Sequence, residues 1–409
     1  MPKFQWKRMI RAMALLAALA MLIATTPLAS AQTETVVYNF RGGTDGYYPY
    51  GVPVLHNGSL YGVTLAGGAY GAGTIYKVTT RGTETVLHTF TGGADGGFPY
   101  AALISDGAGN LYGTTDGGGT YNFGTVFKVT PSGTETILYN FTGTQGGYDS
   151  QGSLVRDAAG NLYGTTYYGG SSVGSNSCGS GCGVVFELTA AGIEKVLYDF
   201  TGGPDGGSPI DGLLKVGSNL YGIASAGGAH NHGAIFKVTL AGKETVLYSF
   251  TGGTDGGLPR GTLIRDSQGN LYGTTEGGGD LNCYGPYLAG CGTVFELTPA
   301  GVEKVLYAFT GGTDGTTPFT GVIRDSEGNL YGSTAYGGNS DCMYGCGTVF
   351  EIIAEGTEKQ LYVLTGGASG VYAEGVVRDS KGNLYAASPF GGNATCNSLG
   401  CGLVFKIAP

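Results

Sequence analysis

Charged residues are scarce in this chain, since Asp, Glu, Lys and Arg together make up 12% of its 409 residues, about half the usual share. So few charges leave little for surface salt bridges, as expected where most elements are buried on both faces. Histidine and tryptophan are rarer still, with four residues and one. No Ser-His-Asp set is visible among them, so a serine hydrolase is not predicted. No stretch after residue 31 shows helical periodicity with helix caps, which excludes a fold built on helices.

Long hydrophobic runs are also absent, with one exception at the N-terminus. Four basic residues open the chain, residues 12–23 are apolar, and small residues at 29–31 offer a cleavage site. This pattern predicts a signal peptide over residues 1–31 and a secreted protein, periplasmic or extracellular. A membrane anchor is the alternative, but the apolar run is short for a spanning helix. No cysteine follows the apolar run, which argues against a lipid anchor, and no apolar segment near Pro409 indicates a C-terminal anchor.

The mature chain is expected to be acidic. The 21 basic residues less the four in the signal leave 17, against 30 acidic residues. This balance disfavours nucleic acid and anionic membrane surfaces as partners. We therefore expect no nucleic-acid partner. We also expect a monomer without a membrane span after signal cleavage.

A tandem repeat fills the rest of the chain. Its anchor is the tripeptide Leu-Tyr-Gly, present six times, with Leu-Tyr-Ala as a seventh copy. The copies stand at residues 60–62, 111–113, 162–164, 220–222, 271–273, 330–332 and 384–386. Spacings of 51, 51, 58, 51, 59 and 54 residues are typical of solenoids, propellers and arrays. The 81 glycines follow the same period, so they are expected in turns and not in a low-complexity tail.

Each repeat predicts four short strands, here named A to D. In the unit from Gly261 to Phe309, strand-forming residues alternate with turn residues, and the strands fall at 262–266, 270–275, 293–298 and 303–309. Four strands in about 50 residues are typical of one propeller blade. Seven units then give 28 strands.

The phase of the repeat predicts how the array ends. The repeated part opens with a D segment, residues 35–40, and reaches Pro409 without the D segment of its last unit. We therefore predict an all-β, seven-bladed β-propeller over residues 32–409, with strand 35–40 completing the last blade and closing the ring. Closure removes the unpaired edges of an open array, and no polar caps of a linear solenoid are evident.

All eight cysteines lie in B–C loops, two in each of four loops. The pairs are Cys178 and Cys182, Cys283 and Cys291, Cys342 and Cys346, and Cys396 and Cys401. In an exported protein, a local disulfide within each loop is the simplest arrangement. Zinc bound by thiolates of neighbouring loops is the alternative.

Three motifs recur in a fixed order, with good instances at 251–256 (Thr-Gly-Gly-Thr-Asp-Gly), 269–275 (Gly-Asn-Leu-Tyr-Gly-Thr-Thr) and 292–299 (Gly-Thr-Val-Phe-Glu-Leu-Thr-Pro). With these motifs, residues 34–409 resemble the GloVer (gloeo/verruco) tandem repeat, which is found in exported bacterial proteins with various C-terminal anchors. The resemblance implies export and a repeat-built β fold, and it implies no established activity or catalytic residue. This chain departs from the anchored members in having no recognisable anchor.

Residues that break the repeat are the candidate ligand site. The A–B and C–D turns are short and uniform, whereas the loops of the opposite face vary, which is typical of a binding face. At the start of strand A, where the channel should open, the pattern-breaking residues are Tyr100, Gln151, Asp211, Arg260, Thr320 and Glu374. The B–C loops add Tyr121, Tyr167, Tyr168 and Tyr284. A solvated loop rim is the alternative interpretation.

Recurrent polar residues are interpreted as scaffold. The aspartates of Gly-Gly-x-Asp-Gly (Asp45, Asp95, Asp205, Asp255 and Asp314) should accept backbone N–H bonds in turns, with calcium binding as the alternative. Basic residues end strand A in six blades (His56, Arg156, Lys215, Arg265, Arg324 and Arg378). They are expected to bond carboxylates between strands, and an anion-binding ring is the alternative. His230 and His232 lack a third metal ligand, which favours a solvated loop.

The sequence therefore favours an exported, non-enzymatic propeller that binds an extracellular glycan or protein through its variable loop face. No catalytic residue and no cofactor is assigned, and calcium stays an alternative. A secreted carboxylate- or calcium-dependent polysaccharide hydrolase or lyase is the second hypothesis. A structural cell-surface protein is the third.

Overall fold

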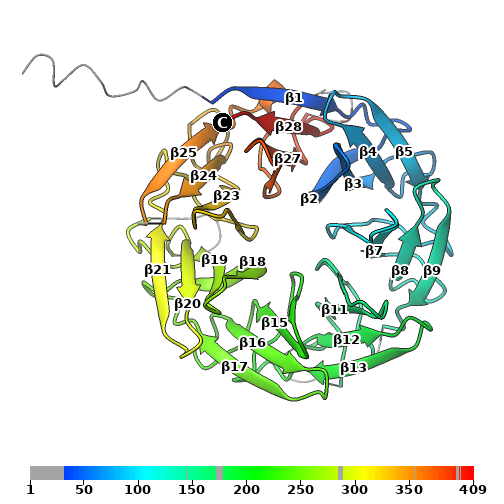
Figure 1. Ribbon diagram of the computed structural model, residues 1–409, viewed down its shortest axis with the longest axis horizontal. Coiled ribbons are helices and arrows are strands. Elements are labelled where there is room, and N and C mark those ends of the chain that lie inside the picture. The colour runs from blue at the N-terminus through cyan, green and yellow to red at the C-terminus, as the bar shows by residue number, and fades with distance from the viewer. Residues whose placement is uncertain are drawn as a thin grey trace, which may run out of the picture. The chain divides into compact units, whose positions relative to one another are not determined.

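Seven four-stranded antiparallel sheets form a ring in the computed structural model (Figure 1). The structure describes residues 32–143, 145–171, 178–283, 289–354, 356–392, 396 and 398–409. The propeller unit runs from Glu34 to Pro409, and the predicted signal peptide lies outside the described residues. The all-β, seven-bladed propeller predicted from the repeat is confirmed.

Six blades place their four strands in sequence order from the channel to the rim, and the seventh takes its outermost strand, β1, from the start of the chain. The innermost strands, A, are β2 (Tyr47–His56), β6 (Ile104–Ser105), β10 (Val155–Arg156), β14 (Leu214–Val216), β18 (Gly257–Arg265), β22 (Ile323–Arg324) and β26 (Val377–Arg378). The B strands are β3 (Ser59–Ala66), β7 (Leu111–Thr115), β11 (Leu162–Thr166), β15 (Asn219–Ala224), β19 (Leu271–Gly277), β23 (Leu330–Thr334) and β27 (Leu384–Ser388).

The outer half of each blade is equally regular. The C strands are β4 (Thr74–Thr79), β8 (Thr125–Val129), β12 (Val184–Leu188), β16 (Ala234–Thr239), β20 (Thr293–Leu297), β24 (Thr348–Ile352) and β28 (Leu403–Ile407). The D strands are β5 (Glu84–Thr89), β9 (Glu135–Asn140), β13 (Glu194–Asp199), β17 (Glu244–Ser249), β21 (Glu303–Ala308), β25 (Glu358–Val363) and β1 (Glu34–Asn39). A single-turn 3-10 helix, η1 (Gly367–Ser369), is the one helical element in the described ranges, where no helix is long and apolar enough to cross a membrane.

The ring closes through the two ends of the repeated chain, as the phase of the repeat predicts. β1 pairs antiparallel with β28, from Glu34 opposite Ile407 to Asn39 opposite Leu403, and the two strands lie side by side in Figure 1. The N–H of Phe40 then donates to the carbonyl of Gly402 at 3.1 Å. The last blade is therefore completed by the first strand.

The glycine of Leu-Tyr-Gly makes room for an aromatic ring of the neighbouring strand. Gly113 stands opposite Phe127 in the β7–β8 register, and a Cβ at Gly113 would lie 2.7 Å from Cζ of Phe127. Here glycine is needed for space and not for an unusual backbone conformation. In the last blade Ala386 stands opposite Phe405, so this position accepts a methyl group where the ring can shift.

The Tyr of Leu-Tyr-Gly closes a polar network at the A–B turn. Asp266 accepts the backbone N–H of Asn270 at 2.9 Å, its side-chain amide at 3.0 Å and the hydroxyl of Tyr272 at 2.9 Å. Burial opposes ionisation, but the bonds from Tyr272 and Asn270 outweigh it and lower the pKa of Asp266. Equivalent networks surround Asp106, Asp157, Asp325 and Asp379.

The expected bonds between the basic residues of strand A and carboxylates are wrong. The guanidinium of Arg324 lies over the ring of Tyr272, 5.7 Å from its centroid. Arg156, Lys215 and Arg378 lie in the same way over Tyr112, Tyr163 and Tyr331. Across the described residues, no ion pair includes these side chains. The aspartates are already bonded to Asn and Tyr, so the cations contact the ring face instead.

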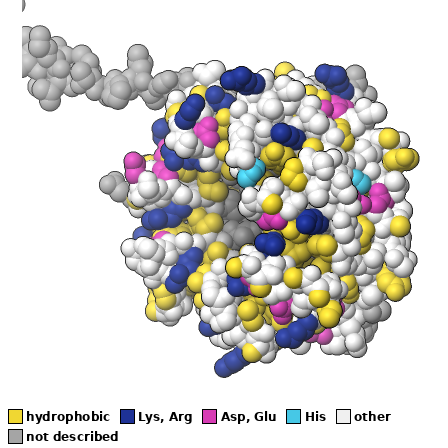
Figure 2. All heavy atoms as spheres, turned by 45° about the vertical axis from the view of Figure 1, so that its right-hand side comes forward, with side chains coloured by type: hydrophobic (Ala, Val, Ile, Leu, Met, Phe, Trp, Pro, Cys, Tyr) yellow, Lys and Arg dark blue, Asp and Glu magenta, His cyan; other side chains and the backbone are white. Residues whose placement is uncertain are grey.

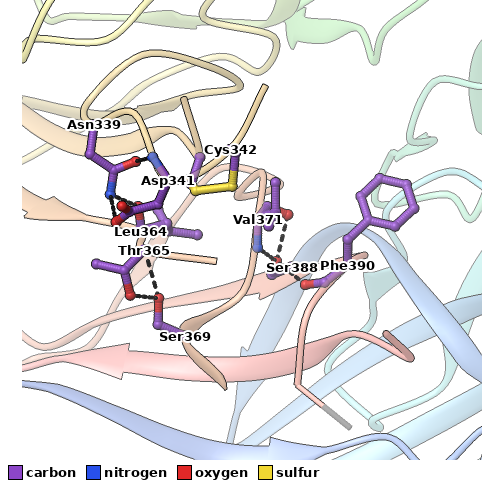
Figure 3. The surroundings of a disulfide bond; sticks show 10 residues. Asn339, Asp341, Cys342, Leu364, Thr365, Ser369, Val371, Ser388 and Phe390 are labelled. Carbon is purple, nitrogen blue, oxygen red and sulfur yellow. Dashed lines mark hydrogen bonds between the residues drawn. A yellow bond between two sulfur atoms is a disulfide. The ribbon is translucent and has the colours of Figure 1, made fainter. Parts of the chain in front are cut away.

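The Gly-Gly-x-Asp-Gly aspartates hold their own turns, as the scaffold interpretation predicts. Asp255 accepts the N–H of Thr251 at 2.8 Å and the hydroxyl of Tyr248 at 3.0 Å. In the last blade Ser369 replaces the aspartate, and its Oγ accepts the N–H of Thr365 at 2.8 Å (Figure 3). A shorter side chain thus makes the same turn contact.

Four disulfides link the cysteines within their own loops, which confirms the predicted pairing. Figure 3 shows the Cys342–Cys346 bond, with Asn339 donating to Leu364 O and so tying the loop to strand D. The carbonyl of the second cysteine accepts an N–H from the next blade. These bonds are Ser208 to Cys182, Thr317 to Cys291, Tyr372 to Cys346 and Tyr48 to Cys401, at 2.7 to 2.9 Å. Each disulfide therefore fixes a contact between blades.

Candidate functional site

The centre of the ring holds a cavity of about 300 Å³ that is lined by residues of all seven blades. Six of its lining residues are the candidates predicted at the start of strand A, namely Tyr100, Gln151, Asp211, Arg260, Thr320 and Glu374. Figure 2 shows the hollow at the centre of one face, with apolar, Lys and Arg side chains around it. Residues at or just before strand A in six different blades thus line one common cavity.

In every blade, the segment that leads to the cavity contains one non-glycine residue with a positive φ, in the left-handed region. These residues are Tyr48, Phe98, Asp149, Ser208, Leu258, Thr317 and Tyr372, with φ between 51° and 69°. A side chain in this conformation costs roughly 1–2 kcal/mol. The N–H of Leu258 donates to the carbonyl of His232 in the preceding blade at 2.9 Å, and equivalent bonds recur around the ring. The repeated strain is offset by contacts between blades.

Arg260 is held in place on both sides within the cavity wall. Its Nε donates to Oε2 of Glu276 at 2.9 Å, and its guanidinium lies over the ring of Phe319, 4.4 Å from the centroid. Burial opposes the charge, but Glu276 and Asp211 outweigh it and raise the pKa of Arg260. The cation is therefore fixed and permanently charged.

Asp211 and Glu374 are two carboxyl groups in different surroundings. Asp211 accepts the N–H of Gly261 at 2.8 Å; burial raises its pKa, while Arg260 and this bond oppose the rise. Glu374 is 4% exposed, and burial raises its pKa to about 8 against the opposing N–H of Gly51. Its Oε1 has no hydrogen-bond partner among the described residues. Glu374 is thus largely protonated at neutral pH and offers an unused donor.

Aromatic rings complete the site. Tyr50 and Tyr100 are stacked, with centroids 4.6 Å apart and planes 25° apart. Burial, followed by the nearby Glu374, raises the pKa of both hydroxyls above the ordinary value. Both therefore stay neutral donors and acceptors. The cavity consequently combines Tyr100, which is backed by Tyr50, with a neutral acid, a second carboxyl group and a fixed cation.

The B–C loop tyrosines do not line this cavity. Tyr168 stacks with Tyr148 at 5.4 Å, and Tyr167 packs edge-on against Tyr168 at 4.6 Å. Tyr121 is 56% exposed, and Tyr284 lies outside the described residues. His230 and His232 belong to no cluster of potential metal ligands in the part of the chain that the structure describes.

Sequence reasoning missed Glu276 and a buried acid pair formed by Asp116 and Asp149. Burial and then Asp149 raise the pKa of Asp116 to about 8, and Gln151 donates to Oδ1 of Asp149 at 2.9 Å. Glu276 and Asp116 occupy the position five residues after the Leu of Leu-Tyr-Gly, where the other blades carry Leu65, Tyr167, Ser225, Ala335 and Pro389. This position breaks the repeat too, so the same criterion would have found it.

Comparison with known proteins matches the repeat and the fold. The sequence model of the Gloeobacter/Verrucomicrobia repeat matches residues 24–179 and 172–342. No curated protein matches the chain.

Among solved structures, the chain is similar to a gluconolactonase from Xanthomonas campestris, with 14% identity, 94% of each chain covered and a TM-score of 0.46. It is also similar to the extracellular domain of a protein described as a hybrid two-component system from B. thetaiotaomicron. There the identity is 12% and the TM-score is 0.51, and the match covers 93% of this chain and 42% of the other. At such identities the likeness concerns the fold alone.

Proposed function

The chain belongs to the Gloeobacter/Verrucomicrobia repeat family, and we propose that it is an exported propeller that binds the end of an extracellular glycan in its central cavity without turning it over. The observation that carries this proposal is the convergence of six repeat-breaking residues on one cavity. Export is supported by the expected signal peptide and by four disulfides, which persist in oxidising compartments.

The chemistry of the cavity suits a sugar ring. Sugar hydroxyls both donate and accept hydrogen bonds, and the cavity offers the protonated Glu374 as donor and Asp211 as acceptor. Tyr100, which lines the cavity and is stacked on Tyr50, offers aromatic surface to the apolar face of a ring. A volume of about 300 Å³ lies at the lower end of the range for small-molecule sites, roughly 300–1,000 Å³. One or two terminal sugar units fit that size better than a protein surface does.

A glycan array followed by calorimetry tests the proposal. Tyr100→Ala should weaken binding at least about tenfold, which corresponds to about 1.4 kcal/mol. The matched control is Tyr121→Ala, which removes an exposed tyrosine outside the cavity and should leave affinity unchanged. Both variants should melt within a few degrees of the parent. Binding that survives Tyr100→Ala and is lost in Tyr121→Ala would move the site to the loop tips. Capture of a protein partner with no glycan binding would overturn the glycan assignment.

A polysaccharide hydrolase or lyase is the second candidate, favoured by one observation. Glu374 and Asp211 line the same cavity, and the pKa of Glu374 is raised to about 8, which suits a general acid beside a carboxylate. Glu374→Gln separates the two proposals, because the amide keeps a neutral hydrogen-bond donor but cannot transfer a proton. Under the binding proposal this variant retains affinity and no product forms with either protein. Sustained product release by the parent that Glu374→Gln abolishes would establish the enzyme.

A further inference from the structure

The junction between the outer strands of the first two blades departs from its counterparts. In the other blades a tyrosine stands two positions before the buried residue that follows strand D. In the first blade His88, in β5, takes its place. At four other junctions this tyrosine donates its hydroxyl to the aspartate of the following loop. Tyr38 bonds Asp45 at 2.8 Å, and Tyr198, Tyr248 and Tyr307 bond Asp205, Asp255 and Asp314 at 3.0 Å. His88 therefore stands where the repeat places a hydrogen-bond donor.

His88 makes no such bond. Its Nε2 lies 3.7 Å from Oδ2 of Asp95 and 3.6 Å from Oε1 of Glu135, both beyond hydrogen-bond length. Nε2 of His88 and Oε1 of Glu135 are buried, and neither has a hydrogen-bond partner within the described chain. Oδ2 of Asp95 accepts the N–H of Thr91 at 2.8 Å, which fixes its orientation. Buried polar atoms without partners are costly. In the described part of the chain, the equivalent glutamate of every blade has an unpartnered Oε1, so the unpartnered imidazole nitrogen is what distinguishes this junction.

The two distances from His88 are close to the spacing of ligands around a metal ion. Zinc bonds nitrogen and carboxylate oxygen at about 2.0–2.2 Å, and a tetrahedron of that size has ligands about 3.3–3.6 Å apart. The one potential ligand atom of each residue lies within 4.8 Å of the other two. We propose that His88, Asp95 and Glu135 bind a divalent transition-metal ion, zinc in the first place, that links the outer strands of the first and second blades.

The ligand types favour zinc over calcium. Calcium takes oxygen ligands, whereas one imidazole with two carboxylates suits zinc and its neighbours in the transition series.

The site is open enough for an ion to enter. The side chains of His88, Asp95 and Glu135 are 16%, 19% and 12% exposed, so water can fill a fourth coordination position. His88 and Asp95 come from β5 and the loop after it, and Glu135 begins β9. A bound ion would therefore join two sheets that share no strand pairing. The inferred role is a clip between blades, at the rim and apart from the central cavity.

Metal titration of tag-free protein stripped with chelator tests this inference. Calorimetry should show one zinc equivalent, and cobalt in its place should give the intense visible bands of a site of low coordination number. The informative variant is His88→Tyr, which restores the residue of the other blades and should fold normally. His88→Tyr and Glu135→Gln should each lower zinc affinity at least tenfold. The matched control, His230→Ala, alters a histidine outside the cluster and should bind zinc as the parent does.

Thermal melting supplies the second readout. Zinc should raise the Tm of the parent and of His230→Ala by several degrees and leave that of His88→Tyr unchanged, because an ion that binds only the folded state stabilises it. A folded parent that binds no zinc would overturn the proposal. Binding that persists in His88→Tyr, or that is lost in His230→Ala, would overturn it as well. Glycan binding should be unaffected by His88→Tyr, so this test stands apart from that of the central cavity.

Discussion

Replacing Phe40 with alanine tests the closure of the ring at one side chain. Phe40 follows β1, is 0% exposed, and its ring packs 5.0 Å from Tyr76 and 5.2 Å from Tyr38, centroid to centroid. Truncating a fully buried phenylalanine costs about 3–5 kcal/mol of unfolding free energy. For the 376 residues from Glu34 to Pro409, the unfolding entropy is about 0.8 kcal/mol/K. The expected fall in Tm is therefore about 4–6 °C.

Phe250→Ala is the matched control for this substitution. Phe250 occupies the same place after strand β17, is 0% exposed, and packs 5.3 Å from Phe295 and 5.1 Å from Tyr248. The blade of Phe250 is continuous in the chain. Phe250→Ala therefore measures the stability lost with the side chain alone, independently of ring closure. Calorimetric melting with the disulfides intact should give equal falls in Tm for the two variants. If Phe250→Ala lowers Tm by several degrees and Phe40→Ala does not, β1 is undocked in solution and the closed ring is refuted.

Three further predictions concern the edge, the disulfides and pH. Deleting residues 33–41 exposes the outer edge of β28, so light scattering should show oligomers; a monomer with the parent's Tm would contradict this. Non-reducing peptide maps should show each cysteine linked within its loop, and free thiols or links between loops would argue against it. Burial raises the pKa of Glu84, Glu303 and Glu358 from 4.5 to about 7. The folded chain holds these protons at a pH where the unfolded chain has lost them, so Tm should fall from pH 5 to pH 8. Glu303→Gln should flatten this slope, and a Tm that rises over the interval would reject the assignment.

The fold could be predicted because its determinants are periodic in the sequence. Strand content, blade number and the pairing of β1 with β28 follow from the order and phase of short motifs. The disulfides follow from two cysteines in each loop. The residues converging on the cavity could be chosen because a ring brings the same position of every blade to one axis. Departure from the repeat at that position was therefore a spatial criterion as well.

The details that escaped prediction depend on contacts between blades. The stacking of Arg324 on Tyr272 cannot be predicted until it is known that Asp266 of the neighbouring turn is already hydrogen-bonded to Asn270 and Tyr272. The cluster of His88 with Glu135 requires that the end of one outer strand meet the start of the next, which the linear pattern does not state. The raised pKa of Glu374 depends on burial at the channel, whereas the sequence shows only a polar residue at a variable position. Side-chain partners across blades are thus the information that a single repeat lacks.

The pairing of Glu34 with Ile407 joins the beginning and the end of the propeller in one sheet. Closing a loop of this length costs roughly 5 kcal/mol of chain entropy, because the cost grows only with the logarithm of length. Closure also comes late in synthesis. β28 leaves the ribosome last, so β1 keeps an unpaired edge until then. Any tag, fusion or truncation at either terminus consequently acts on the same sheet. A circular permutant that joins the present termini and opens another C–D turn would move this seam to a blade of choice.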